Sequence, residues 1–393
     1  MKKYFILAAA AILTIAACSK SEIDNTNSGP KEISYNAVTA KNQMTKAINN
    51  KTFYAPGDPS FGIWGLYNAE SWAADPDAAA SYWVGTNAST PAHITYQTNA
   101  WKNSTINYWP ITGSLTFMGY SPFNYWGATE ETATAVPASL SKSTVTYENA
   151  ETHENETTDC VLLSVSNFSS STGSFVTDLM WSDAVERTYA TANTNYDADG
   201  NNTTTYNGVP VVFHHALSQI AVYASTDHDY ANEDYTFTIT AMSMTIDDNA
   251  TLTVKDNLVN DPTVSWTEPA TDATRTILPA NSTSVLSTSV VAQGDPFLVI
   301  PQALSGNDIL TITYQVAHNN VVSTVTKTIN LYAGETDLSD ENHNDDYLAS
   351  FVKNTKYNLN LVFSLEEIKY SPSISAWEGP EDVEYEVPHD ANN

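Results

Sequence analysis

Apolar and polar residues alternate in short runs along most of the chain. A period of two is typical of β-strands, because successive side chains point to opposite faces of a sheet. β-Branched and aromatic residues fill these runs, and Gly, Pro, Asn and Asp separate them, which favours strands joined by turns. The pattern predicts strands at 33–37, 61–65, 115–122, 161–165, 209–224, 237–246, 297–302, 309–316, 321–331, 357–365 and 368–377.

These strands fall into two successive groups, with a division near Asn260. Extended amphipathic helical patterns are scarce, so each group must bury its apolar face by packing sheet against sheet. The chain has 393 residues, which is enough for two domains or one large β domain. We therefore predict an all-β protein made of two tandem sandwiches.

The first eighteen residues are typical of an export signal. Two lysines precede an apolar run at 4–17, which is too short to span a bilayer as a permanent helix. The segment Ile15–Cys18 resembles the bacterial lipobox. That resemblance implies cleavage before Cys18 and attachment of lipid such as palmitate to its sulfur and new N-terminus. Residues 19–31 form a polar tether with nothing to bury.

The chain is strongly acidic, with a formal net charge of −29. A surface of this charge repels nucleic acid, so nucleic acid is excluded as a partner. Cysteine is nearly absent. If Cys18 carries lipid, Cys160 is left without a partner for a disulfide, and its apolar surroundings predict a buried, inert thiol.

No pattern of catalytic residues stands out, and we predict that the chain is not an enzyme and needs no cofactor. His214 and His215 are neighbours on a predicted strand and point to opposite faces, which disfavours a shared metal. The segment Asp197–Asn201 lacks the distal glutamate of a calcium loop. The hypothesis that Trp72 and Trp83 form a glycan-stacking platform stays open beside a role in the core.

Two segments at opposite ends of the mature chain share one pattern. Ile33, Tyr35 and Ala37 alternate with polar residues, and so do Val383, Tyr385 and Val387. The first segment lies between the tether and an exposed basic residue, Lys46, where proteolysis removes a strand easily. The second could fill the place of the first in register, since a slip of one residue would bury glutamates. It could equally pair within its own domain.

Several further motifs occur in a fixed order along the chain, and together with the lipobox they resemble the fimbrillins, the lipoprotein pilins of type V pili. They are Thr45-Lys46-Ala47 before the turn Phe53–Asp58, Phe61–Trp64, Phe213–Ile220, Val299–Gln302, Lys356–Leu361 and Ile368–Trp377.

The resemblance implies two transthyretin-like β-sandwich domains. A surface trypsin-like protease would remove the first strand, with Lys46-Ala47 as the best site and Lys41 and Lys51 as competitors. We assign 1–18 to the signal peptide and 19–31 to the tether. Residues 32–260 would form the N-terminal domain with the removable strand, and 261–393 the C-terminal domain with the candidate donor strand.

The implied function is a fimbrial subunit for cell adhesion. It would be held on the outer membrane through the lipid at Cys18 and would polymerise with other pilin subunits by donor-strand exchange. A stalk subunit needs both a removable strand and a donor, whereas a tip lacks the donor and an anchor keeps its first strand. The alternative from another class is a monomeric surface lipoprotein that binds glycan or another host ligand.

Overall fold

The computed structural model describes residues 32–40, 48–49, 60–69, 81–97, 100–125, 135–149, 153–170, 177–189, 195–196, 202–203, 208–269, 271–332, 348–375 and 384–385. Over these residues the chain is all-β, as predicted, and its one helical turn is the 3-10 helix η3 (Tyr230–Glu233). None of the helical segments described here is long and apolar enough to cross a membrane.

One large sheet holds the leading strand. It contains β1 (Tyr35–Ala40), β2 (Ile48–Asn49), β3 (Phe61–Asn68), β4 (Ser81–Val84), β5 (Ala92–Gln97), β6 (Ala100–Asn103), β7 (Ser114–Ser121), β10 (Met180–Ser182), β11 (Val185–Thr188), β14 (Val209–His215) and β29 (Glu384–Tyr385).

This sheet closes on itself. Its strand order is β11-β7-β10-β14-β1-β6-β5-β3-β4, and β3 pairs with β7 as well as with β5. Seven strands (β7, β10, β14, β1, β6, β5 and β3) therefore form a ring. Within this ring β1 has a neighbour on each side, so it is an internal strand and not an edge.

Three further sheets of four or five strands carry most of the remaining chain. The first has β18 (Thr263–Trp266), β17 (Ala250–Asp256), β9 (Asn155–Phe168) and β8 (Ala138–Glu148). The second has β21 (Val291–Ala292), β22 (Phe297–Val299), β15 (Ser218–Thr226), β27 (Lys356–Phe363) and β28 (Ile368–Ser375). The third has β19 (Thr271–Leu278), β20 (Ser284–Val285), β16 (Tyr235–Asp248), β24 (Ile309–His318) and β25 (Val321–Asn330).

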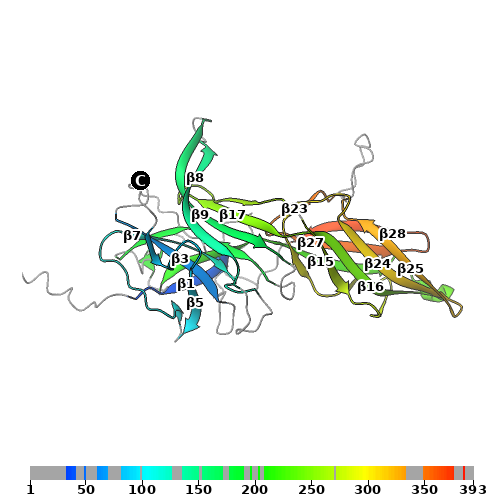
Figure 1. Cartoon of the computed structure of the whole chain (residues 1–393). Helices are drawn as coiled ribbons and strands as arrows, with labels where there is room; N and C mark the ends of the chain where they lie inside the picture. The colour runs from blue at the N-terminus through cyan, green and yellow to red at the C-terminus, as the bar shows by residue number, and fades with distance from the viewer. Residues whose placement is uncertain are drawn as a thin grey trace, which may run out of the picture.

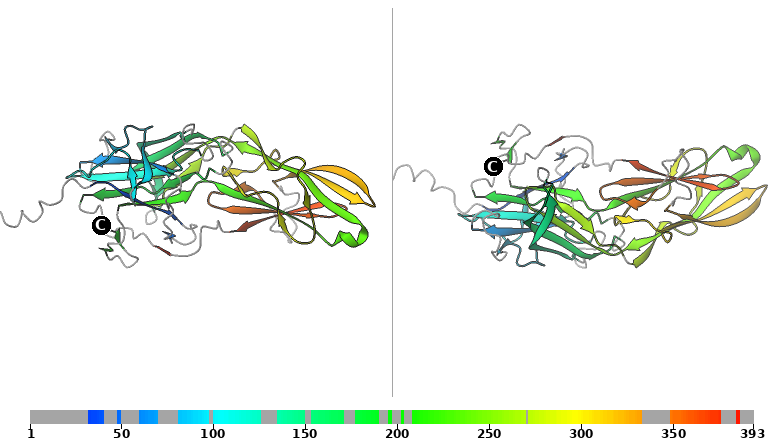
Figure 2. Two further views of the ribbon diagram at one scale, coloured as in Figure 1. Left: turned by 90° about the horizontal axis from the view of Figure 1, so that it is seen from below. Right: turned by 90° about the horizontal axis from the view of Figure 1, so that it is seen from above.

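Two short strand pairs complete the described structure: β12 (Asn195–Tyr196) with β13 (Asn202–Thr203), and β23 (Gln302–Ala303) with β26 (Ser350–Phe351). The closed sheet lies toward one end of an elongated molecule, and β16, β24, β25 and β28 lie toward the other (Figure 1). The views from below and above show the same elongated arrangement (Figure 2). Strands from both sides of residue 260 share sheets, since β15 pairs with β27 and β17 pairs with β18.

Each group of sheets encloses its own apolar cluster. One cluster fills the closed sheet and includes Ile33, Tyr35 and Phe117. A second lies against β8, β9 and β17, and the third is shared by the sheets of β15 and β16. Cys160, in β9, is a buried free cysteine, and burial raises the pKa of its thiol to about 11, which agrees with the predicted inert thiol.

A buried ion pair within one sheet is hydrogen-bonded to the end of β9, which belongs to another sheet. The Arg275 guanidinium on β19 lies 3.6 Å from a carboxylate oxygen of Asp248, at the end of β16. The same carboxylate accepts hydrogen bonds from the Ser170 amide at 2.9 Å and the Ser169 hydroxyl at 2.6 Å, both just after β9. Removing one partner of such a pair leaves a buried charge without compensation and is strongly destabilising. The hydrogen bonds to Ser169 and Ser170 connect this pair to the end of β9.

The carboxylate of Asp256 is expected to make the free energy of unfolding depend on pH. It is 4% exposed and accepts amide hydrogen bonds from Ala184 and Leu258, each at 2.7 Å, and burial raises its pKa from 3.8 to about 6. A raised pKa in the folded state contributes stability below the unfolded value that is lost as pH rises through the folded value. We therefore expect the wild type to gain about 2 kcal/mol relative to Asp256→Asn between pH 7.5 and pH 4.5.

Urea unfolding of both proteins at the two pH values measures this difference. The asparagine variant is the control, because it carries every other titrating group of the chain. A difference that stays constant with pH would show that Asp256 does not titrate in this range.

Candidate functional site: the channel around the leading strand

The leading strand β1 is held mainly by one neighbour. It pairs in parallel with β14 from Tyr35, opposite Val209, to Thr39, opposite Phe213. Its pairing with β6 on the other side is antiparallel and joins Tyr35 to Trp101. β1 therefore completes the ring with a continuous ladder on one side and a short contact on the other.

The three predicted inward residues, Ile33 just before β1 and Tyr35 and Ala37 within it, are all buried. Ile33 and Tyr35 are 3% exposed and Ala37 is 2% exposed, whereas Ser34 and Asn36 between them are partly exposed. The period-two alternation thus gives the burial that the sequence predicts. These three side chains pack in the apolar cluster inside the closed sheet, and the space that they fill there is called the channel.

The ring of Tyr35 lies in an aromatic part of this channel. It meets Phe117 edge-on at 5.9 Å between centroids and Phe61 edge-on at 6.2 Å. Such edge-to-face contacts add to the free energy of burial. The Tyr35 hydroxyl is buried without a hydrogen-bond partner, and burial raises its pKa.

The residues that line the channel could not be recognised from the sequence as neighbours of the leading strand. They come from five different strands and from the segment between β6 and β7, and alternation within any one strand marks a residue only as part of a core. The lining includes Phe61, Trp101, Trp109, Phe117, Met180, Val209, Val211 and Phe213.

The start of β1 is fixed by polar contacts. The Glu32 carboxylate lies 3.0 Å from the Lys102 ammonium. The Ile33 amide donates to the Asn107 carbonyl at 2.9 Å, and the Val209 amide donates to the Ser34 carbonyl at 2.8 Å. Gly208, with φ +130°, approaches Ser34 so closely that a Cβ would lie 2.6 Å from its carbonyl oxygen, so the site needs glycine.

Of the other predicted site residues, only Tyr385 lies within the described part of the chain. Cys18, Lys46, Ala47, Val383 and Val387 lie outside the described residues. Tyr385 belongs to β29, which pairs with β2 of the same chain, so that Tyr385 lies opposite Ile48. Because β2 is antiparallel to both β1 and β29, β29 runs parallel to β1.

The histidine doublet on β14 binds two different carboxylates. His214 Nε2 lies 2.9 Å from Asp183, and His215 Nδ1 lies 2.7 Å from Asp178. His214 lies opposite Trp181 and His215 opposite Met180, and these two residues belong to different apolar clusters, which confirms the prediction that the two rings point to opposite faces. No group of three or more metal-ligating side chains occurs in the part of the chain that the structure describes. The segment 197–201 lies outside that part.

The second aromatic candidate is only partly described. Trp83 is 40% exposed, its ring lies 5.4 Å from that of Tyr67, and its indole N–H donates to the Tyr108 carbonyl at 2.7 Å. Tyr82 donates to the Leu140 carbonyl at 2.8 Å. Neighbouring residues of a strand face opposite sides, so Tyr82 does not extend the surface of Trp83. Trp72 lies outside the described residues.

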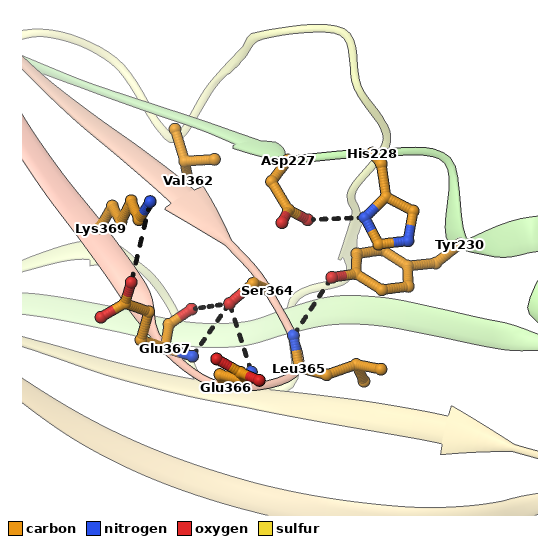
Figure 3. A pocket seen from close by; sticks show the side chains of 9 residues that line it. All are labelled: Asp227, His228, Tyr230, Val362, Ser364, Leu365, Glu366, Glu367 and Lys369. Atoms are coloured by element: carbon orange, nitrogen blue, oxygen red, sulfur yellow. Dashed lines mark hydrogen bonds and ion pairs between the residues drawn. The ribbon is translucent and has the colours of Figure 1, made fainter.

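A pocket of about 350 Å³ lies far from β1, at the turn between β27 and β28 (Figure 3). Its polar groups bind one another: the Ser364 hydroxyl accepts from the Glu367 amide at 2.9 Å, and the Tyr230 hydroxyl accepts from the Leu365 amide at 3.2 Å. A hydrogen bond from Tyr230 lowers the pKa of Asp227. These contacts fix the turn, and we assign the pocket no ligand.

The described residues form an all-β fold whose closed sheet is completed by the first strand of the chain itself. A sequence model described as fimbrillin-like matches residues 45–377. The chain therefore belongs to the fimbrillin-like family, whose members are structural proteins of cell-surface fimbriae and not enzymes. The resemblance stated from the sequence is confirmed.

Solved structures of similar proteins share little sequence with the chain. A fimbrial protein from Bacteroides vulgatus is 15% identical, with 88% of this chain and 100% of that chain covered and a TM-score of 0.46. The fimbrial anchor protein Mfa2 from Porphyromonas gingivalis is 10% identical, with 89% and 98% covered and a TM-score of 0.29. A comparison with curated proteins finds no match.

Proposed function

We propose that the chain is a fimbrial subunit that polymerises by donor-strand exchange after proteolysis near Lys46. The observation that carries the proposal is the position of β1, an internal strand of a closed sheet with Ile33, Tyr35 and Ala37 buried in an apolar channel. A cut after Lys46 would separate this strand from the rest of the chain.

Loss of β1 would open the ring and expose both backbone groups and apolar side chains that are now buried. The edge of β14 from Val209 to Phe213 would lose the strand with which it pairs, and the aromatic residues of the channel would meet water. Unpaired backbone groups and exposed apolar surface both favour pairing with another strand. An incoming strand of matching alternation would restore the ladder and the core together.

The candidate donor is the tail segment 383–387 of a neighbouring subunit. Its Val383, Tyr385 and Val387 match the inward positions of β1 in type and spacing. Compared with Ile33 and Ala37, the two valines together carry only one more carbon atom, so the total volume is nearly conserved, and cores tolerate such exchanges best. A chain with both a removable strand and a donor would serve as a stalk subunit.

The N-terminal segment supports the same proposal. Export with lipid on Cys18 would bring the chain to the outer membrane, where a trypsin-like surface protease would act on it. The tether at 19–31 would keep the cutting site accessible. After the cut, the lipid anchor and β1 would leave together, and the remaining body would be free to join a fibre.

Controlled proteolysis of the exported protein tests this proposal. Trypsin at low concentration is expected to yield a new N-terminus at Ala47 and a ladder of oligomers, because cutting exposes the channel. The measurements are N-terminal sequencing and size-exclusion chromatography. The control is the triple variant Lys41→Gln, Lys46→Gln and Lys51→Gln, which is expected to stay monomeric under the same treatment.

The competing function is a monomeric surface lipoprotein that binds glycan, for which the half-exposed Trp83 is the candidate contact. The same experiment separates the two. A cut protein that stays monomeric, with the peptide that contains β1 still bound, would exclude polymerisation and favour the monomeric function.

A further inference from the structure

The polar contacts at the start of β1 restrict the register of an incoming donor strand further than the apolar alternation of that strand does. We infer that Lys102 fixes the register of the donor by binding the carboxylate of Asp382 from a second copy of the chain, in the place that Glu32 occupies before cutting. This inference rests on the proposed function and adds to it a specificity-determining residue.

The apolar channel first limits the possible registers. Ala37 is 2% exposed, so a donor shifted to place Tyr385 there would have no room for the ring. A shift the other way would place Val387 between Phe61 and Phe117, where the Tyr35 ring now makes both aromatic contacts, and would leave a cavity. A shift by one residue would bury glutamates. The best register therefore places Tyr385 at the position of Tyr35.

In that register an acidic residue falls on the position of Glu32. The leading segment reads Glu-Ile-Ser-Tyr-Asn-Ala from Glu32, and the tail reads Asp-Val-Glu-Tyr-Glu-Val from Asp382. Asp382 therefore aligns with Glu32, whose carboxylate lies 3.0 Å from the Lys102 ammonium. Removing β1 would leave this lysine beside the open channel without that carboxylate.

Because the chain is strongly acidic, Lys102 is one of few positive charges that could attract an acidic donor segment. The chain has 45 acidic residues and 16 lysines and arginines, so two copies repel each other over most of their surfaces. The lysine side chain is 28% exposed, and a partly buried cation is screened less than one on the open surface. An acidic residue at the start of the donor would thus be attracted to the position that Glu32 now occupies beside Lys102.

A charge-swap cycle between two separate chains tests the inference. The acceptor is the cut chain carrying Tyr385→Ala, so that its own tail cannot donate. The donor is the uncut chain, whose own β1 fills its channel. Each junction then gives a dimer, and the dimer fraction is measured by size-exclusion chromatography for Lys102 or Lys102→Glu acceptors with Asp382 or Asp382→Lys donors.

Both matched combinations, unchanged with unchanged and Lys102→Glu with Asp382→Lys, are expected to form dimers. Each mismatched combination should bind about tenfold more weakly, and this difference should shrink at high salt. The control donor Glu386→Lys makes the same change of charge at the position aligned with Asn36, and it should not discriminate between the two acceptors.

The outcomes separate this inference from the function on which it rests. Equal dimer formation in all four combinations would overturn the role of Lys102 and leave strand exchange intact. A lack of dimers with the unchanged acceptor and donor would count against the tail as donor, and the inference would fall with it.

Discussion

Replacing Tyr35 by alanine is expected to lower the free energy of unfolding of the uncut chain by about 3–5 kcal/mol, the range for truncating a large buried aromatic residue. The side chain is 3% exposed and makes edge-on contacts with Phe61 and Phe117, so its removal leaves a cavity between two rings. Urea unfolding of the uncut protein measures this loss.

The matched control is Tyr35→Phe, which keeps the ring and removes the hydroxyl. That hydroxyl is buried without a hydrogen-bond partner, so its removal should leave the stability equal or raise it by about 1 kcal/mol. If Tyr35→Ala unfolds like the wild type, the ring does not contribute to the core, and the channel is not the site of the leading strand.

The sequence was sufficient to predict the character of the leading strand. Ile33, Tyr35 and Ala37 alternate with polar neighbours, and a strand with one buried face follows directly from that pattern. Their burial and the opposite directions of His214 and His215 are confirmed. Both predictions depend only on the local period of a strand, which neighbouring residues determine.

The closure of the sheet could not be predicted in the same way. β1 pairs with β14, some 170 residues further along the chain, and β3 pairs with β7. Such pairings depend on which apolar faces pack together, and no local pattern records that choice. For the same reason no local pattern predicts that β16 and β17, which follow each other directly, belong to different sheets.

The ion pair between Glu32 and Lys102 is another feature that became visible only in three dimensions. Glu32 and Lys102 are 70 residues apart, and in the sequence each is one charged residue among many. The contact is the basis for the proposal that Asp382 of the tail takes the place of Glu32, since both segments carry an acidic residue before the same apolar pattern.

Replacing Tyr385 by alanine is expected to have the opposite consequences to Tyr35→Ala. In the uncut chain Tyr385 belongs to the two-residue strand β29, so its truncation should change the free energy of unfolding by less than about 1 kcal/mol. In the fibre the same ring would fill the channel, so each junction should lose about 3 kcal/mol or more, a fall in affinity of at least 100-fold. The measurement is oligomer formation after cutting.

Comparison of the two tyrosine variants separates the role of each strand. After cutting, Tyr35→Ala should polymerise at least as readily as the wild type, because its weakened first strand leaves more easily and the donor is unchanged. Tyr385→Phe should also assemble normally, since the position of the Tyr35 hydroxyl offers no hydrogen-bond partner. If cut Tyr385→Ala forms the same ladder as the wild type, another segment fills the channel, and the tail is not the donor.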